Sequence, residues 1–125
     1  MTSIEQVEQF HRAFGVPVKD DPDIDDQDIN ELRVRLLQEE LDELTCALAE
    51  GDPGGTLDAL TDLQYVLDGT YLSLGFSKVK DAAFAEVHRS NMSKLDLDGK
   101  PIRRADGKVM KGALYFPPNL DPFVV

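Results

Sequence analysis

Apolar residues recur every three to four positions through much of the chain, the spacing of helices that bury one face. A first helix is expected over residues 3–14, with Ser3 as its N-cap and Gly15 at its end. An acidic loop follows, and Gln27 or Asp28 leads into a long second helix. A third helix is expected over about 56–74, ended by Gly75, and a fourth over about 78–94. The pattern therefore predicts an all-α, antiparallel bundle of about four helices.

Two changes of composition divide this pattern. Gly51-Asp52-Pro53-Gly54-Gly55 is a strong stop-and-turn signal between the second and third helices. After Leu95, the turn signals Asp98-Gly99 and Asp106-Gly107 and several basic residues replace the helical periodicity. We expect a single domain over 1–125, with the helical bundle at about 3–95 and an irregular basic C-terminal arm at 96–125.

Carboxylates interrupt the apolar face of the second helix. At about 100° per residue, Glu40 falls near the middle of that face and Glu43 at its edge, with Glu39 just beyond. An acid in a core-facing stripe costs several kcal/mol of desolvation unless a cation meets it. No Lys or Arg stands three or four residues from Glu40 or Glu43, or from Asp58 and Asp62 on the third helix. A missing counter-ion explains this pattern.

The same acids match in height along the predicted hairpin. With about 1.5 Å of rise per residue, Glu43 and Asp62 lie equally far from the turn, and Glu40 and Asp58 lie within about one turn of them. Carboxylates from two antiparallel helices then converge on one point. Oxygen-only ligation suits Mg²⁺, or Mn²⁺ as a possible substitute. The alternative is a solvated acidic helix face that binds no metal.

Composition narrows the classes of partner. The net charge of −11 argues against nonspecific binding to nucleic acid or to an anionic membrane surface. The single Cys46 excludes an internal disulfide and leaves no second cysteine for a zinc site. No stretch approaches the roughly 20 apolar residues of a membrane span, and no signal-peptide pattern begins the chain. We expect a cytoplasmic protein.

Polar residues continue the inward stripe of the fourth helix. Asn91 and Lys94 prolong that stripe toward the C-terminal end of the helix. This position suggests that the two side chains reach a buried rim, although a solvated helix end gives the same pattern. The arm beyond it is basic in an otherwise acidic chain, so it can bind a polyphosphate from the side opposite a metal, or form a solvated tail. Its basic residues are Lys100, Arg103, Arg104, Lys108 and Lys111.

These motifs together resemble the MazG-like, all-α nucleoside triphosphate pyrophosphohydrolases, a superfamily that includes phosphoribosyl-ATP pyrophosphohydrolase and dimeric dUTPases. The metal signature of that group is Glu-x-x-Glu on one helix and Glu-x-x-Asp on the next. The chain has Glu40-x-x-Glu43, preceded by Glu39, and Asp62 as the final acid. It departs at Ala59, where the family has Glu. Either Asp58 then supplies the fourth ligand, or three ligands hold the metal.

The likeness extends to the C-terminal motifs. Residues 86–94, Glu-Val-His-Arg-Ser-Asn-Met-Ser-Lys, and residues 103–108, Arg-Arg-Ala-Asp-Gly-Lys, resemble the MazG-like branch closest to bacterial dUTP-cleaving members. The resemblance implies hydrolysis of a (deoxy)nucleoside triphosphate between its α and β phosphates. It also implies assembly as a homodimer or a dimer of dimers.

The resemblance also implies roles for the candidate residues. Glu39, at the edge of the cluster, is the candidate base for the attacking water. The expected metal ligands are Glu40, Glu43, Asp62 and Asp58, and the expected phosphate-binding residues are Asn91, Lys94, Lys108, Arg104 and Lys111.

Two other hypotheses remain open. The acids could form a non-catalytic helical interaction module for a basic partner, a hypothesis that the departure at Ala59 keeps open. The chain could also be a nucleotide sensor that has kept the fold and lost the activity. The preferred base and sugar do not follow from the sequence, and a substrate like phosphoribosyl-ATP is not excluded.

Overall fold

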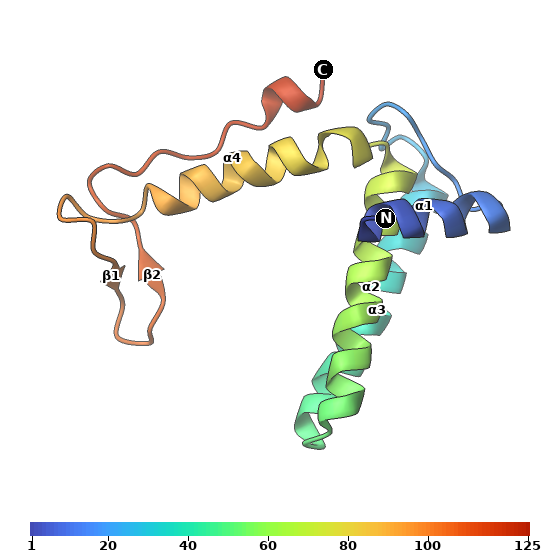
Figure 1. Ribbon diagram of the computed structural model, residues 1–125, viewed down its shortest axis with the longest axis horizontal. Helices are drawn as coiled ribbons and strands as arrows, with labels where there is room; N and C mark the ends of the chain where they lie inside the picture. The colour runs from blue at the N-terminus through green and yellow to red at the C-terminus, as the bar shows by residue number, and fades with distance from the viewer. The chain divides into compact units, whose positions relative to one another are not determined.

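Helices dominate the structure of the chain, a computed structural model that describes residues 1–125. The elements are α1 (Ser3–Phe14), α2 (Gln27–Ala49), α3 (Pro53–Leu74), the 3-10 turn η1 (Ser77–Val79), α4 (Lys80–Met92), the strands β1 (Ile102–Arg103) and β2 (Val109–Met110), and the 3-10 turn η2 (Asp121–Phe123). The two strands form one short antiparallel ribbon. Figure 1 shows this order, and the predicted all-α class is confirmed. No helix combines the length and the apolar composition needed to cross a membrane.

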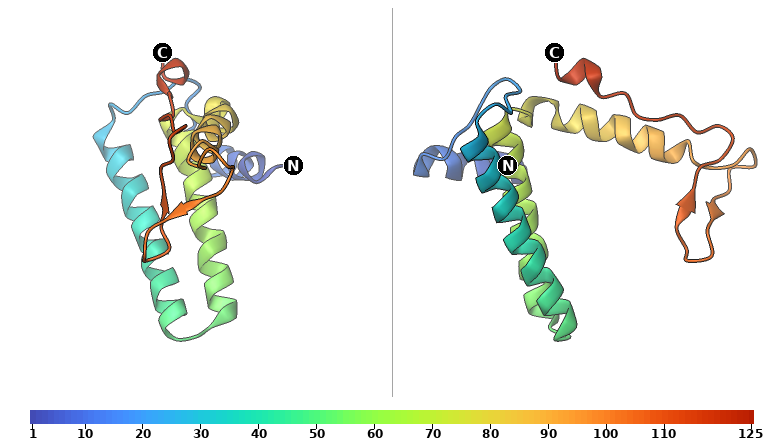
Figure 2. Two further views of the ribbon diagram at one scale, coloured as in Figure 1. Left: turned by 90° about the vertical axis from the view of Figure 1, so that its left-hand side faces the viewer. Right: turned by 180° about the vertical axis from the view of Figure 1, so that it is seen from behind.

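The chain divides into two compact units, Met1–Lys78 and Val79–Val125. In the first unit, α2 and α3 run side by side as an antiparallel hairpin, and α1 packs against α3 away from the hairpin turn (Figures 1 and 2). The core is small: Val7, Ala47, Ala59 and Leu72 are its buried apolar residues. Close contact between α2 and α3 therefore depends on small side chains in the half nearest the turn.

The cap of α1 differs from the sequence prediction. Thr2, not Ser3, caps α1: its Oγ1 accepts a hydrogen bond from the main-chain N–H of Glu5. The Ser3 hydroxyl is instead used for packing, since it donates to Asp68 Oδ2 of α3 at 2.7 Å. The predicted Ser3 cap is therefore wrong by one residue.

An aspartate caps each of the next two helices. Asp26 caps α2 by accepting from the main-chain N–H groups of Asp28 and Ile29, and the helix begins at Gln27, as predicted. Asp52 caps α3, and Pro53 occupies the first turn. Pro53 and the two following glycines are therefore helical rather than part of the turn. Helix α3 begins three residues before the predicted start.

The acidic loop between α1 and α2 covers the C-terminal end of α3. Lys19 and Asp23 donate main-chain hydrogen bonds to the carbonyl oxygens of Leu72 and Leu74, both at 2.9 Å. Helix α3 ends at Gly75, whose φ of +82° and whose contact with the Asp21 main chain leave no space for a Cβ atom. The loop thus satisfies carbonyl groups that a helix end otherwise leaves without partners.

The second unit is held together by hydrogen bonds between α4 and the C-terminal segment. Ser90 Oγ donates to the Phe116 carbonyl oxygen, and Ser93 Oγ accepts from the Phe116 N–H. Glu86 Oε2 accepts from the Asn119 N–H at 2.8 Å, and the Arg89 guanidinium lies 4.4 Å from the centre of the Phe116 ring. Helix α4 begins two residues later than predicted because Ser77–Val79 forms a 3-10 turn.

Candidate metal centre on the hairpin of α2 and α3

Three carboxylates meet between α2 and α3. Glu40 and Glu43 stand one turn apart on α2, and Asp62 lies at the same height on α3. One carboxylate oxygen from each residue lies within 4.8 Å of the others. The convergence predicted from the two helix heights is therefore present for these three acids.

Glu40 is the shielded member of this cluster. Its Oε2 atom is buried and accepts no hydrogen bond. Desolvation raises the pKa of its carboxyl, and the negative charges of Glu43, Asp62 and Asp58 raise that pKa further. No Lys or Arg lies within ion-pair distance of the cluster. The chain thus has an acidic site with no cation of its own, as the sequence pattern indicated.

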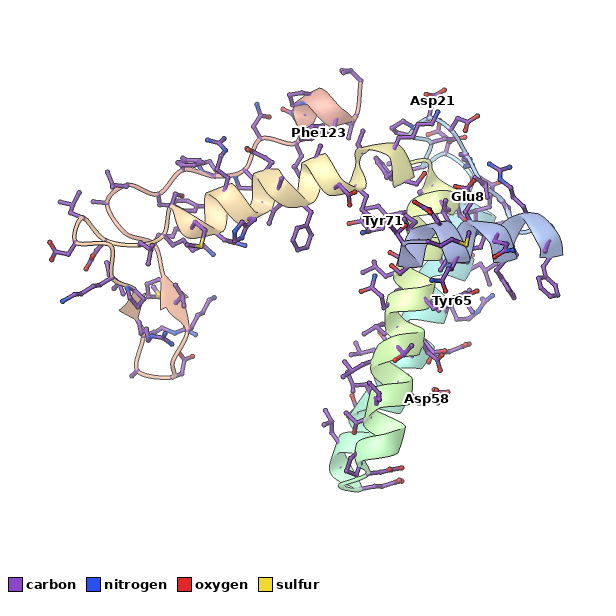
Figure 3. All side chains as sticks on the ribbon, in the orientation of Figure 1. Glu8, Asp21, Asp58, Tyr65, Tyr71 and Phe123 are labelled. Carbon is purple, nitrogen blue, oxygen red and sulfur yellow. The ribbon has the colours of Figure 1, made fainter.

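The other two acids of the prediction lie outside this cluster. Asp58 is exposed on α3, on the hairpin below Tyr65 in Figure 3, and it is not among the converging oxygens. It lines a shallow groove of about 360 Å³ together with Glu43 and Cys46. Glu39 is exposed on α2, next to Glu40 in the chain.

A small-residue contact occupies the position beside the cluster where the family pattern has its fourth acid. Ala59 is only 2% exposed and Ala47 of α2 is also buried. A Cβ atom added at Gly55 would lie 3.6 Å from the Cβ atom of Ala47, so the helix backbones approach closely here. The methyl group of Ala59 is part of the core of the hairpin and supplies no ligand.

The predicted phosphate-binding residues belong to the second unit. They differ in whether their charged groups already bind another side chain of that unit. Arg104 binds Asp106 through Nε at 3.0 Å and through Nη2, which raises the pKa of Arg104 and lowers that of Asp106. Lys111 lies 4.7 Å from the centre of the Tyr115 ring. Lys94 and Lys108 form no ion pair, and Asn91 is exposed at the end of α4.

Sequence reasoning missed two buried charged residues in the first unit. Arg33 of α2 is 6% exposed, and it donates to the Val66 carbonyl oxygen at 2.8 Å and to Thr70 Oγ1 at 3.2 Å. Asp68 of α3 is fully buried and accepts from Ser3 and Gln64. The sequence contains one signal for the burial of Arg33: it follows Ile29 by four residues, which places it on the apolar face of α2.

The donor set fits a hard divalent cation. All three converging groups are carboxylates, and the buried Glu40 oxygen is without any partner inside the chain. Mg²⁺ and Mn²⁺ prefer such oxygen ligands, and they leave part of the coordination shell to water or phosphate.

Comparison with known proteins identifies the family of the chain. The family model described as phosphoribosyl-ATP pyrophosphohydrolase matches residues 7–91, which include α2, α3 and the three converging carboxylates. A search of curated proteins gives no significant match. The matched region contains most of the chain, and the MazG-like resemblance of the sequence is confirmed. The chain belongs to the phosphoribosyl-ATP pyrophosphohydrolase family, within the MazG-like superfamily of all-α enzymes that hydrolyse nucleotide phosphoanhydride bonds.

Proposed function

We propose that the chain catalyses the Mg²⁺-dependent hydrolysis of a (deoxy)nucleoside triphosphate between its α and β phosphates. The products are a nucleoside monophosphate and pyrophosphate, and the role is the removal of unwanted nucleotides from the cellular pool. The observation that carries this proposal is the convergence of Glu40, Glu43 and Asp62 inside the region that matches the family. A phosphoribosyl-ATP-like compound contains the same bond and is the runner-up substrate.

Each carboxylate of the hairpin receives a role in this reaction. Glu40, Glu43 and Asp62 would hold the divalent ion, which neutralises charge on the triphosphate and orients it. Glu39, exposed beside them, takes the proton from the attacking water as the new P–O bond forms. The bridging P–O bond breaks and its electron pair leaves with pyrophosphate. Asp58 is placed as an additional acid next to this site.

The basic residues of the second unit supply donors for the phosphate oxygens. Lys94 and Lys108 have no carboxylate partner, so their ammonium groups are free to bind an anion together with the Asn91 amide. Arg104 must share its guanidinium with Asp106, and Lys111 must leave the Tyr115 ring to contribute. We therefore rank Lys94 and Lys108 as the principal phosphate-binding residues.

Assembly as a homodimer or a dimer of dimers is part of the proposal. Helix α2 exposes Val34, Leu41 and Leu48 at intervals of seven residues, so they lie along one face. Helix α3 exposes Leu57, Leu60 and Leu67, and Leu48, Leu57 and Leu60 line a shallow apolar groove at the hairpin turn. Apolar stripes along both helices suit a second hairpin packed against the first.

Pyrophosphate release from a panel of nucleotides tests the activity. The panel contains dUTP, dCTP, dATP, dGTP, their ribose counterparts and phosphoribosyl-ATP, each with Mg²⁺ and with chelator. We expect release only with metal, and its loss in Glu40→Gln. Glu31→Gln, an exposed acid elsewhere on α2, is the matched control and should keep the wild-type rate.

Thermal melting separates the proposal from a non-catalytic role, which the buried Ala59 favours. Stabilisation by Mg²⁺ plus a triphosphate without pyrophosphate release would identify a nucleotide sensor. No stabilisation by any nucleotide with metal would identify an interaction module.

A further inference from the structure

We propose that the nucleotide-free chain holds one divalent ion, on Glu40, Glu43 and Asp62 alone, and that Asp58 is not a ligand of it. This inference rests on the proposed function for its metal, but it concerns the number of ions and their ligands rather than the reaction. It also distinguishes the chain from the four-acid pattern of the superfamily.

The first step is the packing around Ala59. The family pattern places a carboxylate at this position, one turn before Asp62. In this chain Ala59 is almost fully buried, and the neighbouring Ala47 and Gly55 bring the two helices together. The fourth carboxylate is thus replaced by a packed methyl group, and this interior position holds no oxygen donor.

The second step is the position of Asp58. It precedes Asp62 by one turn, but its oxygens are not part of the converging set, and its side chain is exposed. It lines the shallow groove that borders the cluster at Glu43, together with Asp42 and Cys46. Its charge still raises the pKa of Glu40, although less than the charges of Glu43 and Asp62 do. Asp58 therefore acts on the cluster from a distance, as a neighbouring charge.

The third step is the coordination that remains. Mg²⁺ and Mn²⁺ take six ligands, and three monodentate carboxylates fill about half of that shell. The remaining positions belong to water in the nucleotide-free chain and are open to phosphate oxygens. A second ion would need carboxylates of its own, and the further acids beside the cluster, Glu39, Asp42 and Asp58, are exposed and are not part of the converging set.

Mn²⁺ binding measured by titration calorimetry, with the full chain and no nucleotide, tests the number of ions. We expect one ion per chain. Two ions per chain of similar affinity, or none, would overturn the inference. Activity is read separately by pyrophosphate release, so two ions in an active enzyme contradict only this inference. One ion in an inactive protein contradicts only the proposed function.

Two matched variants on α3 test the ligands. Asp62→Asn should weaken Mn²⁺ binding at least 100-fold, because it removes a ligand. Asp58→Asn should weaken it no more than about threefold, because it removes only an exposed, screened charge. Asp42→Asn, which removes another exposed acid from the same groove, gives the size of that charge effect. A loss in Asp58→Asn more than tenfold greater than that in Asp42→Asn would make Asp58 a ligand and overturn the inference. Circular dichroism checks that all three variants are folded.

Discussion

Arg33 donates a hydrogen bond from Nη2 to the main-chain carbonyl oxygen of Val66, 2.8 Å away, inside the contact between α2 and α3. Its Nε atom donates to Thr70 Oγ1, and the buried guanidinium has no carboxylate partner. Two neutral oxygens on adjacent turns of α3 therefore hold a buried positive charge. This arrangement depends on the planar, forked geometry of arginine.

We predict that Arg33→Lys destabilises the chain by about 1–3 kcal/mol, because one ammonium group cannot reproduce both hydrogen bonds and the buried acceptors lose a donor. The midpoint of urea unfolding measures the effect. Arg35→Lys, two positions along α2 and exposed, is the control and should stay within about 0.5 kcal/mol of wild type. Equal stability of the two variants would show that the buried hydrogen bonds contribute nothing specific.

Side chains from α1 and α2 both lie against Gly69 of α3. A Cβ atom there would lie 2.5 Å from Arg33 Nη2 and 2.7 Å from His11 Nε2. Gly69→Ala is therefore expected to cost about 1–3 kcal/mol through overpacking. Gly54→Ala tests the same exchange in the same helix, where the nearest atom is Asp52 Oδ1 at 3.7 Å, and it should be neutral or slightly stabilising. Chemical unfolding of both variants distinguishes crowding from a general effect of alanine.

His11 of α1 is buried close to Gly69 and Arg33. Its Nδ1 donates to the Pro17 carbonyl oxygen at 3.1 Å. Desolvation lowers its pKa below the ordinary 6.5, and the Arg33 charge also lowers it, against the Pro17 hydrogen bond and the Glu8 charge. Between the folded and unfolded pKa values, the unfolded chain binds a proton that the folded chain does not. Stability should therefore fall as the pH drops below about 7 and level off once the folded-state pKa is passed.

Urea unfolding at pH 7.5, 6.5 and 5.5 measures this dependence. His11→Gln should reduce the loss of stability between pH 7.5 and 5.5, whereas His88→Gln, an exposed histidine on α4, should leave it unchanged. A wild-type chain whose stability rises as the pH falls through this range would contradict the prediction.

The exposed apolar stripe on α2 makes a prediction about assembly. Leu41→Glu places a charge at the middle of that stripe, and we expect it to dissociate the oligomer into monomers, as measured by light scattering after gel filtration. Asp28→Leu, in the first turn of α2 and about 140° around the helix from Leu41, should leave the mass unchanged. A wild-type chain that is already monomeric would reject the proposed homodimer.

Helical periodicity was sufficient for the architecture of this chain. It predicted the four helices, both ends of α1, the end of α3 and the heights that bring Glu43 and Asp62 together. It was less reliable at helix starts, because Thr2 and Ser3 are equally good caps by composition. Only the contact with Asp68 decides which hydroxyl caps the helix and which packs against α3.

The buried charges were beyond the reach of this reasoning. A single-sequence pattern treats an arginine or an aspartate on an apolar face as an interruption, whereas Arg33 and Asp68 are satisfied by partners more than 30 residues away in the chain. The ligand role of Asp58 was equally undecidable, because a residue four positions before Asp62 lies on the same side of the helix. The three-dimensional structure shows that its oxygens lie outside the converging set.

Cys46 is the only thiol of the chain, and it is exposed in the groove that Glu43 and Asp58 line. A maleimide fluorophore or a nitroxide therefore labels one defined position, about one helical turn from the proposed metal ligand Glu43, without prior mutagenesis. Paramagnetic Mn²⁺ would quench or broaden the signal of such a label over this distance. The wild-type protein thus carries a natural attachment point for a spectroscopic reporter of its own metal occupancy.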